Sequence, residues 1–333
     1  MHGNARQRLA GEQRTSAMLT LSLMRNAILA VVAAVSVTAC LGKGIPADRG
    51  IEATFPKASA STSLPGTLRV ATFNVHREPG DVVARGIKHD RARRDVDLFV
   101  MQEVHRVEKK GTEACSAACS LGKDLGFYSL YAPGHVQDDG TDGVAILSRA
   151  PILSGQVMEL PYFDVTFNSG RRIALIATLL VDGTPVTVYA VHLDNRLTSD
   201  QRRVQMRPVL QHARRQKTPV IIAGDFNTSP FSWAGGVVPI PTTRQDNALE
   251  SLVREHGFDT PVTGSGPTFR YLGMRLDAIY TRGFDTQRFA TAAAQNVSDH
   301  LALWAVMKAR GVTKADVAVH RATPRTTATI DAR

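Results

Sequence analysis

The sequence has little cysteine, with three residues in 333, and two of these lie close together in Cys115-Ser-Ala-Ala-Cys119. No second pair of cysteines or histidines completes a tetrahedral ligand set, which disfavours a zinc site at this segment. A disulfide between Cys115 and Cys119 fits an oxidising compartment. If the segment is helical, however, this spacing strains the bond, and two free thiols are the alternative.

Excess charge of one sign is also scarce in the central part of the chain. The net charge of +10 arises mostly at the ends, because residues 1–40 carry +3 and residues 308–333 carry +4. Residues 41–307 hold 30 basic and 27 acidic side chains, which leaves a net charge of +3. A general polyanion-binding function is therefore weakly supported.

The chain lacks a hydrophobic run long enough to span a bilayer comfortably, but a shorter run follows Arg25. Residues 26–39 are uncharged and end in small residues, which is typical of a secretory signal. The segment V-T-A-C that ends at Cys40 resembles a bacterial lipobox. We therefore expect an exported lipoprotein with a signal peptide over residues 1–40, lipidated at Cys40, anchored in the membrane and facing the periplasm or the cell surface. A plain cleaved signal or a short anchor helix is the alternative.

Composition divides the rest of the chain into three parts. Residues 41–66 are rich in Gly, Pro, Ala, Ser and Thr without periodicity, which predicts a flexible tether. Residues 67–307 contain neither a linker nor a repeat and are expected to form one domain. Residues 308–333 have no helical or strand pattern, which predicts a loosely ordered basic tail.

Short β-branched runs and a few amphipathic segments alternate within the domain. Strands are predicted at residues 68–75, 97–104, 143–147, 172–181, 185–192, 220–223, 276–281 and 302–307. Asp182-Gly183-Thr184 between two of these runs predicts a hairpin. Helices are predicted at residues 82–94, 199–215, with a kink at Pro208, and 247–256. Hairpins mixed with crossovers favour an α/β protein in which sheet packs on sheet and helices lie outside.

Polar side chains end several of the apolar runs, as in V-I-I-A-G-D-F-N over residues 220–227. Each of them alone has a simpler explanation, as a turn residue, a helix cap or a buried core histidine. Together they consist only of carboxylates, amides and histidines, which indicates a common site. Eight such residues stand at the ends or edges of these runs: Asn74, Glu103, His192, Asp225, Asn227, Asp277, Asp299 and His300.

Seven short motifs occur in a fixed order, namely T-F-N-V-H, Q-E-V, G-V-A-I-L-S-R, V-H-L, G-D-F-N, R-L-D-A-I and S-D-H. Over about residues 68–307 this ordered set resembles the endonuclease/exonuclease/phosphatase superfamily, which includes deoxyribonucleases, apurinic endonucleases, neutral sphingomyelinases and inositol-polyphosphate phosphatases. The resemblance implies a four-layer α/β/β/α sandwich, with two central mixed β-sheets flanked by helices. It also implies a metal-dependent phosphoesterase whose active site lies at one edge of the two sheets.

The metal-binding roles follow from the same resemblance. Glu103 would be the primary ligand of Mg²⁺, or of Mn²⁺ in its place, and Asn74 a direct or water-mediated ligand. These residue types suit a hard cation, which takes carboxylate and amide oxygens while keeping several waters. Asp299 would lie near the metal or the leaving group.

The catalytic roles are implied in the same way. Asp225 would orient and deprotonate the attacking water, and Asn227 would hold water or phosphate. His192 and His300 would donate hydrogen bonds to phosphate oxygens. Asp277 would accept a hydrogen bond from His300 and fix its tautomer.

The substrate stays open at this point. The expected partner is a phosphate-ester substrate, either nucleic acid, a sphingomyelin-like lipid or an inositol phosphate, and the balanced charge does not demand duplex DNA. The apolar segment over residues 231–240 predicts either a membrane-inserting loop or a segment packed under the domain. We expect a monomer. The alternative of a different class is a lipid-anchored binding protein that keeps the fold without catalysis.

Overall fold

The computed structural model describes residues 44–56, 61–108, 115–164, 170–228, 231–234, 238–241, 245–271, 273–292 and 297–310. All of them belong to the second of two compact units, Leu41–Arg333. The predicted signal segment with Cys40, and residues 311–333 of the predicted tail, lie outside the described residues. Within the described ranges, no helix combines the length and the hydrophobicity that crossing a membrane requires.

One of the two large sheets has seven strands. Its neighbouring strands are antiparallel except for one parallel pair, β2 and β3. Across the sheet the order is β1 (Glu52–Thr54), β4 (Tyr128–Gln137), β5 (Gly140–Ser148), β3 (Leu98–Val107), β2 (Thr67–Asn74), β14 (Ala302–Ala309) and β13 (Phe284–Ala292).

The second large sheet has five strands and again a single parallel pair, β8 and β9. The order is β12 (Asp277–Arg282), β9 (Val220–Asp225), β8 (Thr184–His192), β7 (Ile173–Val181) and β6 (Ile152–Glu159). The predicted hairpin joins β7 to β8, where Asp182 and Gly183 have φ of 49° and 71°. Two successive residues with positive φ are what a tight two-residue hairpin turn needs.

The strands of the seven-stranded sheet are covered on both faces, as β2 illustrates. Leu68 and Val70 belong to the apolar cluster shared with the five-stranded sheet. Ala71 and Phe73, which point to the opposite face, belong to a second cluster shared with helices. A strand buried on both faces must be apolar at successive positions, which is why these segments read as continuous hydrophobic runs.

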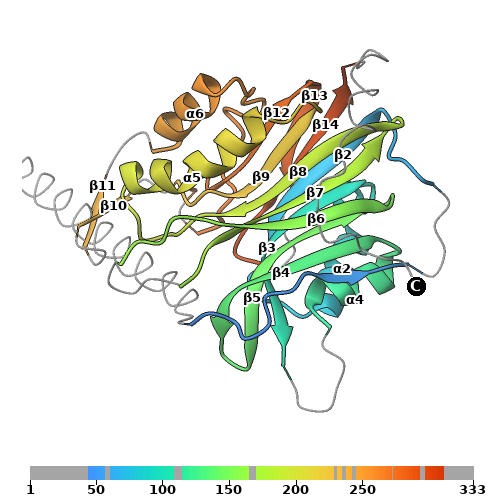
Figure 1. Ribbon diagram of the computed structural model, residues 1–333, viewed down its shortest axis with the longest axis horizontal. Helices are drawn as coiled ribbons and strands as arrows, with labels where there is room; N and C mark the ends of the chain where they lie inside the picture. Colours follow the sequence, from blue (N-terminus) through green and yellow to red (C-terminus); the bar gives the residue numbers. More distant parts are fainter. Residues whose placement is uncertain are drawn as a thin grey trace, which may run out of the picture. The chain divides into compact units, whose positions relative to one another are not determined.

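Helices form the two outer layers (Figure 1). The helices α2 (Gly80–His89) and α4 (Ala117–Leu125) contribute to the cluster on the outer face of the seven-stranded sheet. The helices α5 (Ser199–Arg214) and α6 (Gln245–Glu255) pack against the five-stranded sheet. The predicted four-layer α/β/β/α sandwich is thus confirmed.

One predicted helix is divided in the structure, whereas another lies where it was predicted. The segment predicted as one helix over residues 82–94 divides into α2 and the short α3 (Arg91–Arg94), because Asp90 is extended and its side chain accepts a hydrogen bond from the backbone N–H of Ala92. An aspartate used as a cap in this way ends one helix and begins the next. Pro208 lies inside α5, and the kink expected there stays a prediction.

The structure extends the domain into the segment predicted to be a tether. Residues 52–54 form β1 at the edge of the seven-stranded sheet, where Ala53 pairs with Leu130. Leu64 is buried and bridges to Val181. Glu52 accepts hydrogen bonds from the backbone N–H and the hydroxyl of Ser116. Part of this polar, Pro-containing segment therefore packs against the domain, because apolar residues such as Ala53 and Leu64 pair with strands of the two sheets.

Cys115 and Cys119 are joined by a disulfide, with their Cα atoms 5.4 Å apart. The geometric objection to this bond applies to two cysteines within one helix. Here Ser116 is the N-cap of α4, so only Cys119 lies inside the helix. The Cα separation falls in the range that disulfides ordinarily span.

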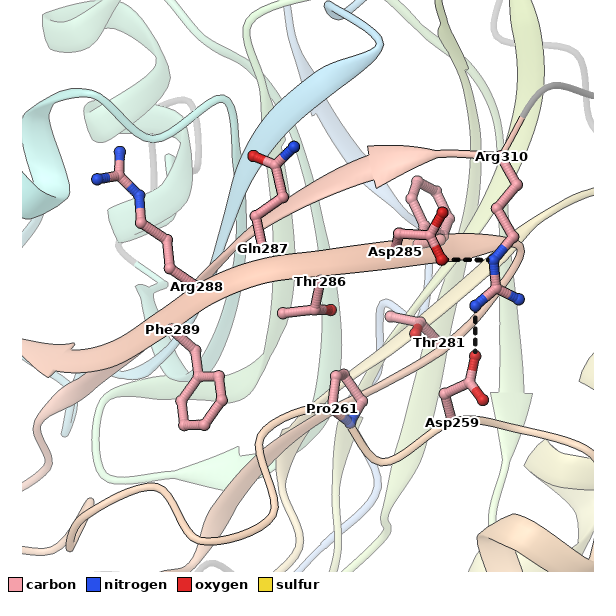
Figure 2. Close-up of a pocket in the computed structure, with 10 residues that line it drawn as sticks. Asp259, Pro261, Thr281, Asp285, Thr286, Gln287, Arg288, Phe289 and Arg310 are labelled. Carbon is pink, nitrogen blue, oxygen red and sulfur yellow. Dashed lines mark hydrogen bonds and ion pairs between the residues drawn. The ribbon is translucent and has the colours of Figure 1, made fainter.

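A groove of about 530 Å³ runs along β13, one of the two edge strands of the seven-stranded sheet (Figure 2). Phe289 faces Pro261 across it, and Arg310 reaches both Asp285 and Asp259 at one end. The groove shares no residue with the eight residues predicted to form a site. Elsewhere, the apolar segment after the G-D-F-N motif forms a separate antiparallel pair, β10 (Phe231–Ala234) and β11 (Val238–Pro241).

Candidate active site

Three neighbouring strands of the five-stranded sheet bring three predicted site residues into register. His192 ends β8, Asp225 ends β9 and Asp277 begins β12. Asp225 pairs directly with His192 on one side and with Asp277 on the other. The motif glycine Gly224 permits this close strand pairing, because a Cβ atom there would collide with the backbone carbonyl of Val191. The three polar groups therefore lie side by side at one edge of the sheet.

Asn74 connects this edge to the other sheet. It ends β2 and is almost fully buried. Its Nδ2 donates to Glu103 Oε1 at 3.0 Å and to Asp225 Oδ2 at 3.1 Å. Its Oδ1 accepts a hydrogen bond from the backbone N–H of His76. One amide group thus holds together carboxylates that belong to two different sheets.

Glu103 reaches the site from an irregular part of β3. The pairing of β3 with β5 shifts at this residue, and its φ is 50°. Positive φ is unfavourable for residues with a side chain, and it turns the Glu103 side chain away from the regular alternation of the strand. His76, Arg77 and Asn227 also have positive φ, of 50°, 60° and 51°. Backbone strain in the described part of the chain is therefore concentrated around these residues.

His300 and Asp277 form a buried ion pair. His300 Nδ1 lies 2.8 Å from Asp277 Oδ2, and His300 Nε2 lies 3.7 Å from Asp225 Oδ2. Burial would lower the pKa of His300, but the charges of Asp277, Asp225 and Asp299 outweigh burial and raise the pKa to about 10. His300 is therefore an imidazolium at neutral pH, with an N–H group available at both ring nitrogens.

Asp225 lies at the centre of these contacts. Burial, followed by the charge of Asp277, raises its pKa to about 7 against the opposing charge of His300. The backbone N–H of Asn227 donates to Asp225 Oδ1 at 2.8 Å, and Asn227 Nδ2 donates to the carbonyl of Leu193. A carboxyl group with a pKa near neutrality can take up a proton during a reaction and release it again.

His192 has a different partner from His300. Arg172 Nη1 lies 3.0 Å from His192 Nδ1, and His192 Nε2 lies 3.7 Å from Asp225 Oδ2. Burial, and then the positive charge of Arg172, lower the pKa of His192 well below its usual range, with smaller contributions from the nearby His135 and His300. His192 is therefore a neutral imidazole. Reasoning from the sequence missed Arg172, which precedes an apolar strand and belongs to none of the seven motifs.

Asp299 occupies the rim of the site, with 17% of its side chain exposed. Its Oδ2 lies 4.0 Å from His76 Nε2. The preceding residue, Ser298, donates from its hydroxyl to the backbone carbonyl of Asn74 and accepts from the backbone N–H of His300. Ser298 thus ties the S-D-H segment to the end of β2, a role that the sequence alone did not assign.

All eight predicted residues consequently lie in one connected group. Their positions alone do not assign their catalytic roles. The carboxyl groups of Glu103 and Asp225 share the Asn74 amide, and Asp299 adjoins His300. His192, Asn227 and Asp277 each contact Asp225 or its imidazolium partner.

The group offers ligands for a divalent cation. One atom from each of Asp225, Asp277 and His300 lies within 4.8 Å of the others. His300 is poorly suited to be a ligand, however, because its ring holds protons between two carboxylates. The oxygen atoms of the site, from carboxylates and an amide, are the ligand types that hard divalent cations prefer.

Comparison with known proteins agrees with this geometry. The model of the Endonuclease/Exonuclease/phosphatase family matches residues 71–300, which include every motif residue named above. A comparison with curated proteins gave no match.

Several solved structures share the fold. An endonuclease/exonuclease/phosphatase from Beutenbergia cavernae superposes with a TM-score of 0.57 and 22% identity, over 74% of this chain and 72% of that chain. A family protein from Leptotrichia buccalis gives a TM-score of 0.56 and 18% identity, over 72% and 98%. The 3′–5′ exonuclease of Neisseria meningitidis gives a TM-score of 0.50 and 17% identity, over 72% and 98%. The chain belongs to the endonuclease/exonuclease/phosphatase family.

Proposed function

We propose that this protein is a metal-dependent phosphoesterase that hydrolyses a phosphodiester or phosphomonoester by attack of water. One observation carries the proposal: Asp225, a buried carboxyl group with a pKa raised towards neutrality, is surrounded by a neutral histidine, an imidazolium and the amide that also holds Glu103. Water activation needs a proton acceptor, and phosphoryl transfer needs positive charge and hydrogen-bond donors around the phosphoryl oxygens.

Glu103 and Asn74 would hold Mg²⁺, or Mn²⁺ in its place, with Asp299 nearby. The ligand atoms that these residues offer fit a hard cation, because they are carboxylate and amide oxygens rather than cysteine sulfur. When bound, the cation neutralises charge on the phosphoryl oxygens.

The side chains around the phosphoryl group would divide the remaining work. Asp225 would accept the proton of the attacking water, while the backbone N–H of Asn227 keeps its Oδ1 engaged and so fixes the carboxylate plane. His300, held by Asp277, would donate to a phosphoryl oxygen as an imidazolium. His192 would donate from Nε2.

Asp299 would act on the leaving-group side of the phosphorus. It is the most exposed of the predicted site residues, and its charge helps to keep His300 protonated. Asn227, which lies next to Asp225, would also contact a water or a phosphoryl oxygen.

Nucleic acid is the substrate class that the neighbours favour, because the Neisseria structure is described as an exonuclease and a related structure from Neisseria as a 3′ phosphatase bound to a product DNA hairpin. A sphingomyelin-like lipid or an inositol phosphate would meet the same requirements at phosphorus. A non-catalytic binding protein would not need a raised carboxyl pKa beside an imidazolium, so this pairing favours catalysis.

We also propose that the protein is exported, lipidated at Cys40 and monomeric. The lipobox-like sequence supports export, and the Cys115–Cys119 disulfide supports an oxidising compartment. Replacement of Cys40 by Ser would move the protein from the membrane fraction to the soluble fraction of the cell. Retention of the Cys40→Ser protein in the membrane fraction would contradict lipid anchoring.

A screen of hydrolysis tests the enzymatic proposal. The purified protein would be incubated with DNA, RNA, sphingomyelin and phosphoinositides, with Mg²⁺ or Mn²⁺ and with chelator. We expect metal-dependent hydrolysis of at least one substrate and its loss in Glu103→Ala. Absence of hydrolysis throughout the screen would refute the proposal.

A further inference from the structure

The two histidines of the site have opposite partners, and this difference points to a role for Arg172. His300 is bonded through Nδ1 to a carboxylate, Asp277, at 2.8 Å. His192 is bonded through the same ring atom to a guanidinium, that of Arg172, at 3.0 Å. Arg172 directly precedes β7, which pairs antiparallel with β8, so the start of one strand lies next to the end of the other.

The chemistry of the two groups determines the direction of the Arg172–His192 hydrogen bond. A guanidinium has only donors and stays protonated in proteins. Nδ1 of His192 must therefore be the acceptor. A neutral imidazole carries a single proton, so that proton lies on Nε2. A carboxylate partner would have the opposite effect, because it would hold a proton on Nδ1 and favour the imidazolium, as Asp277 does for His300.

The Nε2 atom of His192 is directed at the reaction centre. It is buried, lies 3.7 Å from Asp225 Oδ2, and has no hydrogen-bond partner among the residues that the structure describes. A buried N–H without a partner is costly, so such a group is expected to find its partner in a bound ligand. Next to the proposed base, that partner would be a phosphoryl oxygen or the attacking water.

We propose that Arg172 is a positioning residue that fixes His192 in the neutral tautomer protonated on Nε2, so that His192 serves the substrate as an uncharged hydrogen-bond donor. The catalytic part of this proposal rests on the proposed phosphoesterase function, whereas the tautomer itself does not. Arg172 acts through His192 because it is 5% exposed and lies on the Nδ1 side of the ring.

The arrangement has a consequence for the charge of the site. His300 carries one full positive charge. His192 offers a hydrogen-bond donor at Nε2 and adds no second positive charge. An imidazolium at both positions would bring two cations within 4 Å of the same oxygen of Asp225, whose proton affinity would then fall. Arg172 thereby helps to keep Asp225 basic enough to accept a proton.

The tautomer can be measured directly by long-range ¹H–¹⁵N correlation spectroscopy on the full chain labelled with ¹⁵N-histidine. The His192 signals would be assigned by their loss in His192→Gln. We expect an unprotonated Nδ1 and a protonated Nε2 at pH 7. In Arg172→Met, which keeps the length of the side chain but removes the donors, we expect a mixture of tautomers or a ring that becomes protonated on acidification. Arg172→Lys retains a donor and should keep the wild-type signals.

Kinetics on bis(p-nitrophenyl) phosphate with Mg²⁺ supply the second readout. We expect kcat to fall about 10²-fold in Arg172→Met, with KM within about threefold of wild type, since a donor to the transition state is disturbed rather than a binding contact. Arg172→Lys should recover most of that loss.

Two results would overturn the proposal: a wild-type His192 that carries its proton on Nδ1 or on both nitrogens at pH 7, or His192 signals that are identical in Arg172→Met and wild type. If Arg172→Met does not fold, the signals of wild type and Arg172→Lys still decide the tautomer. If no phosphate ester is hydrolysed, the proposed function fails, while the spectrum still tests the role of Arg172.

Discussion

Two regions of this protein pair carboxylates with cationic groups, and they differ in how much water reaches them. At the groove beside β13, Arg310 lies 2.8 Å from Asp285 and 3.6 Å from Asp259, and all three side chains are more than half exposed. At the candidate active site, His300 lies between Asp277 and Asp225, and all three are buried. The distances are similar in the two regions, but the surroundings are not.

The comparison shows why the same residue types serve different purposes. Water screens the charges at the groove, so an exposed ion pair contributes little to stability. At the buried site the loss of hydration is the largest cause that raises the pKa of Asp225, to about 7. For His300, burial lowers the pKa, but the charges of the neighbouring carboxylates outweigh burial and raise it to about 10. A buried carboxyl group with a pKa near neutrality is therefore available for acid–base chemistry at the site.

The largest contrast is expected from the same substitution made in both regions. Asp225→Asn should reduce kcat/KM by at least about 10³-fold, because the near-isosteric amide cannot accept a proton from water. The matched variant, Asp285→Asn at the groove, should retain wild-type activity. Both would be measured with Mg²⁺ on bis(p-nitrophenyl) phosphate. Equal activities of the two variants would contradict the difference that we draw between the buried site and the exposed groove.

The next largest effect concerns the metal. Chelation should abolish hydrolysis, and added Mg²⁺ or Mn²⁺ should restore it. Glu103→Gln should lower kcat/KM by about 10²- to 10³-fold at saturating Mg²⁺, because the amide is a weaker ligand for a hard cation. Glu159→Gln, which alters an exposed carboxylate on β6, is the control and should behave as wild type. Full activity of Glu103→Gln in chelator would exclude this residue as a ligand.

A smaller loss is expected when the partner of His300 is changed. Asp277→Asn keeps an oxygen acceptor near His300 Nδ1 but removes the charge that raises the pKa of His300, so activity should fall about 10- to 100-fold. Asp259→Asn removes an exposed carboxylate and should have no such effect. An unchanged rate for Asp277→Asn across pH 6 to 9 would mean that His300 need not be an imidazolium.

The pH dependence of stability sharpens the comparison further, because the buried histidines His135 and His192 resist protonation. Burial and the charge of Arg172 lower the pKa of His135 to about 3, and the pKa of His192 is also lowered. At these two histidines the unfolded chain therefore binds more protons than the folded protein below about pH 6.5, so their contribution to stability falls as pH falls. Each of these histidines contributes a slope of up to about 1.4 kcal/mol per pH unit. The stabilisation from His300 is complete below pH 6.5, so it does not oppose this acid loss.

Denaturant unfolding at pH 7 and pH 5.5 checks this expectation in wild type and His135→Gln. The variant should lose less stability on acidification than wild type does. An equal loss in the two proteins would show that His135 is protonated in the folded state.

The smallest effect is expected at the groove. Arg310→Gln removes the cation from an exposed ion-pair group and should change the free energy of unfolding by less than about 0.5 kcal/mol. Hydrolytic activity should be unaffected. A loss of more than about 2 kcal/mol would mean that the groove contributes to the fold in a way that its exposure does not suggest.

Much of this architecture could be predicted from the sequence, because buried strands leave a strong pattern. All eight predicted strands are present, and the polar residues that end them converge as expected. Two of the strands that were missed lack that pattern: β13 is polar along most of its length because it is a sheet edge, and β4 contains Pro133 and Gly134 at an irregular register. Local sequence carries little signal for elements that tertiary pairing stabilises.

The site was predictable in its composition but not in its connections. The motifs named Asp225 and His192, yet nothing in the motif set indicated that a guanidinium would hold the histidine. One signal was available, since the hairpin at Asp182 and Gly183 places residues near 172 opposite residues near 192. The bulge that turns Glu103 towards Asn74 had no local signal, because it depends on pairing between β3 and β5.

The contacts around Asp225 lead to one central claim, namely that Asp225 accepts a proton from water during phosphate-ester hydrolysis. The most direct test compares wild type, Asp225→Asn and Asp285→Asn across DNA, RNA, sphingomyelin and phosphoinositides, with Mg²⁺ and with chelator. We predict metal-dependent hydrolysis of at least one substrate by wild type and Asp285→Asn, and none by Asp225→Asn. Hydrolysis by Asp225→Asn at the wild-type rate would contradict the claim.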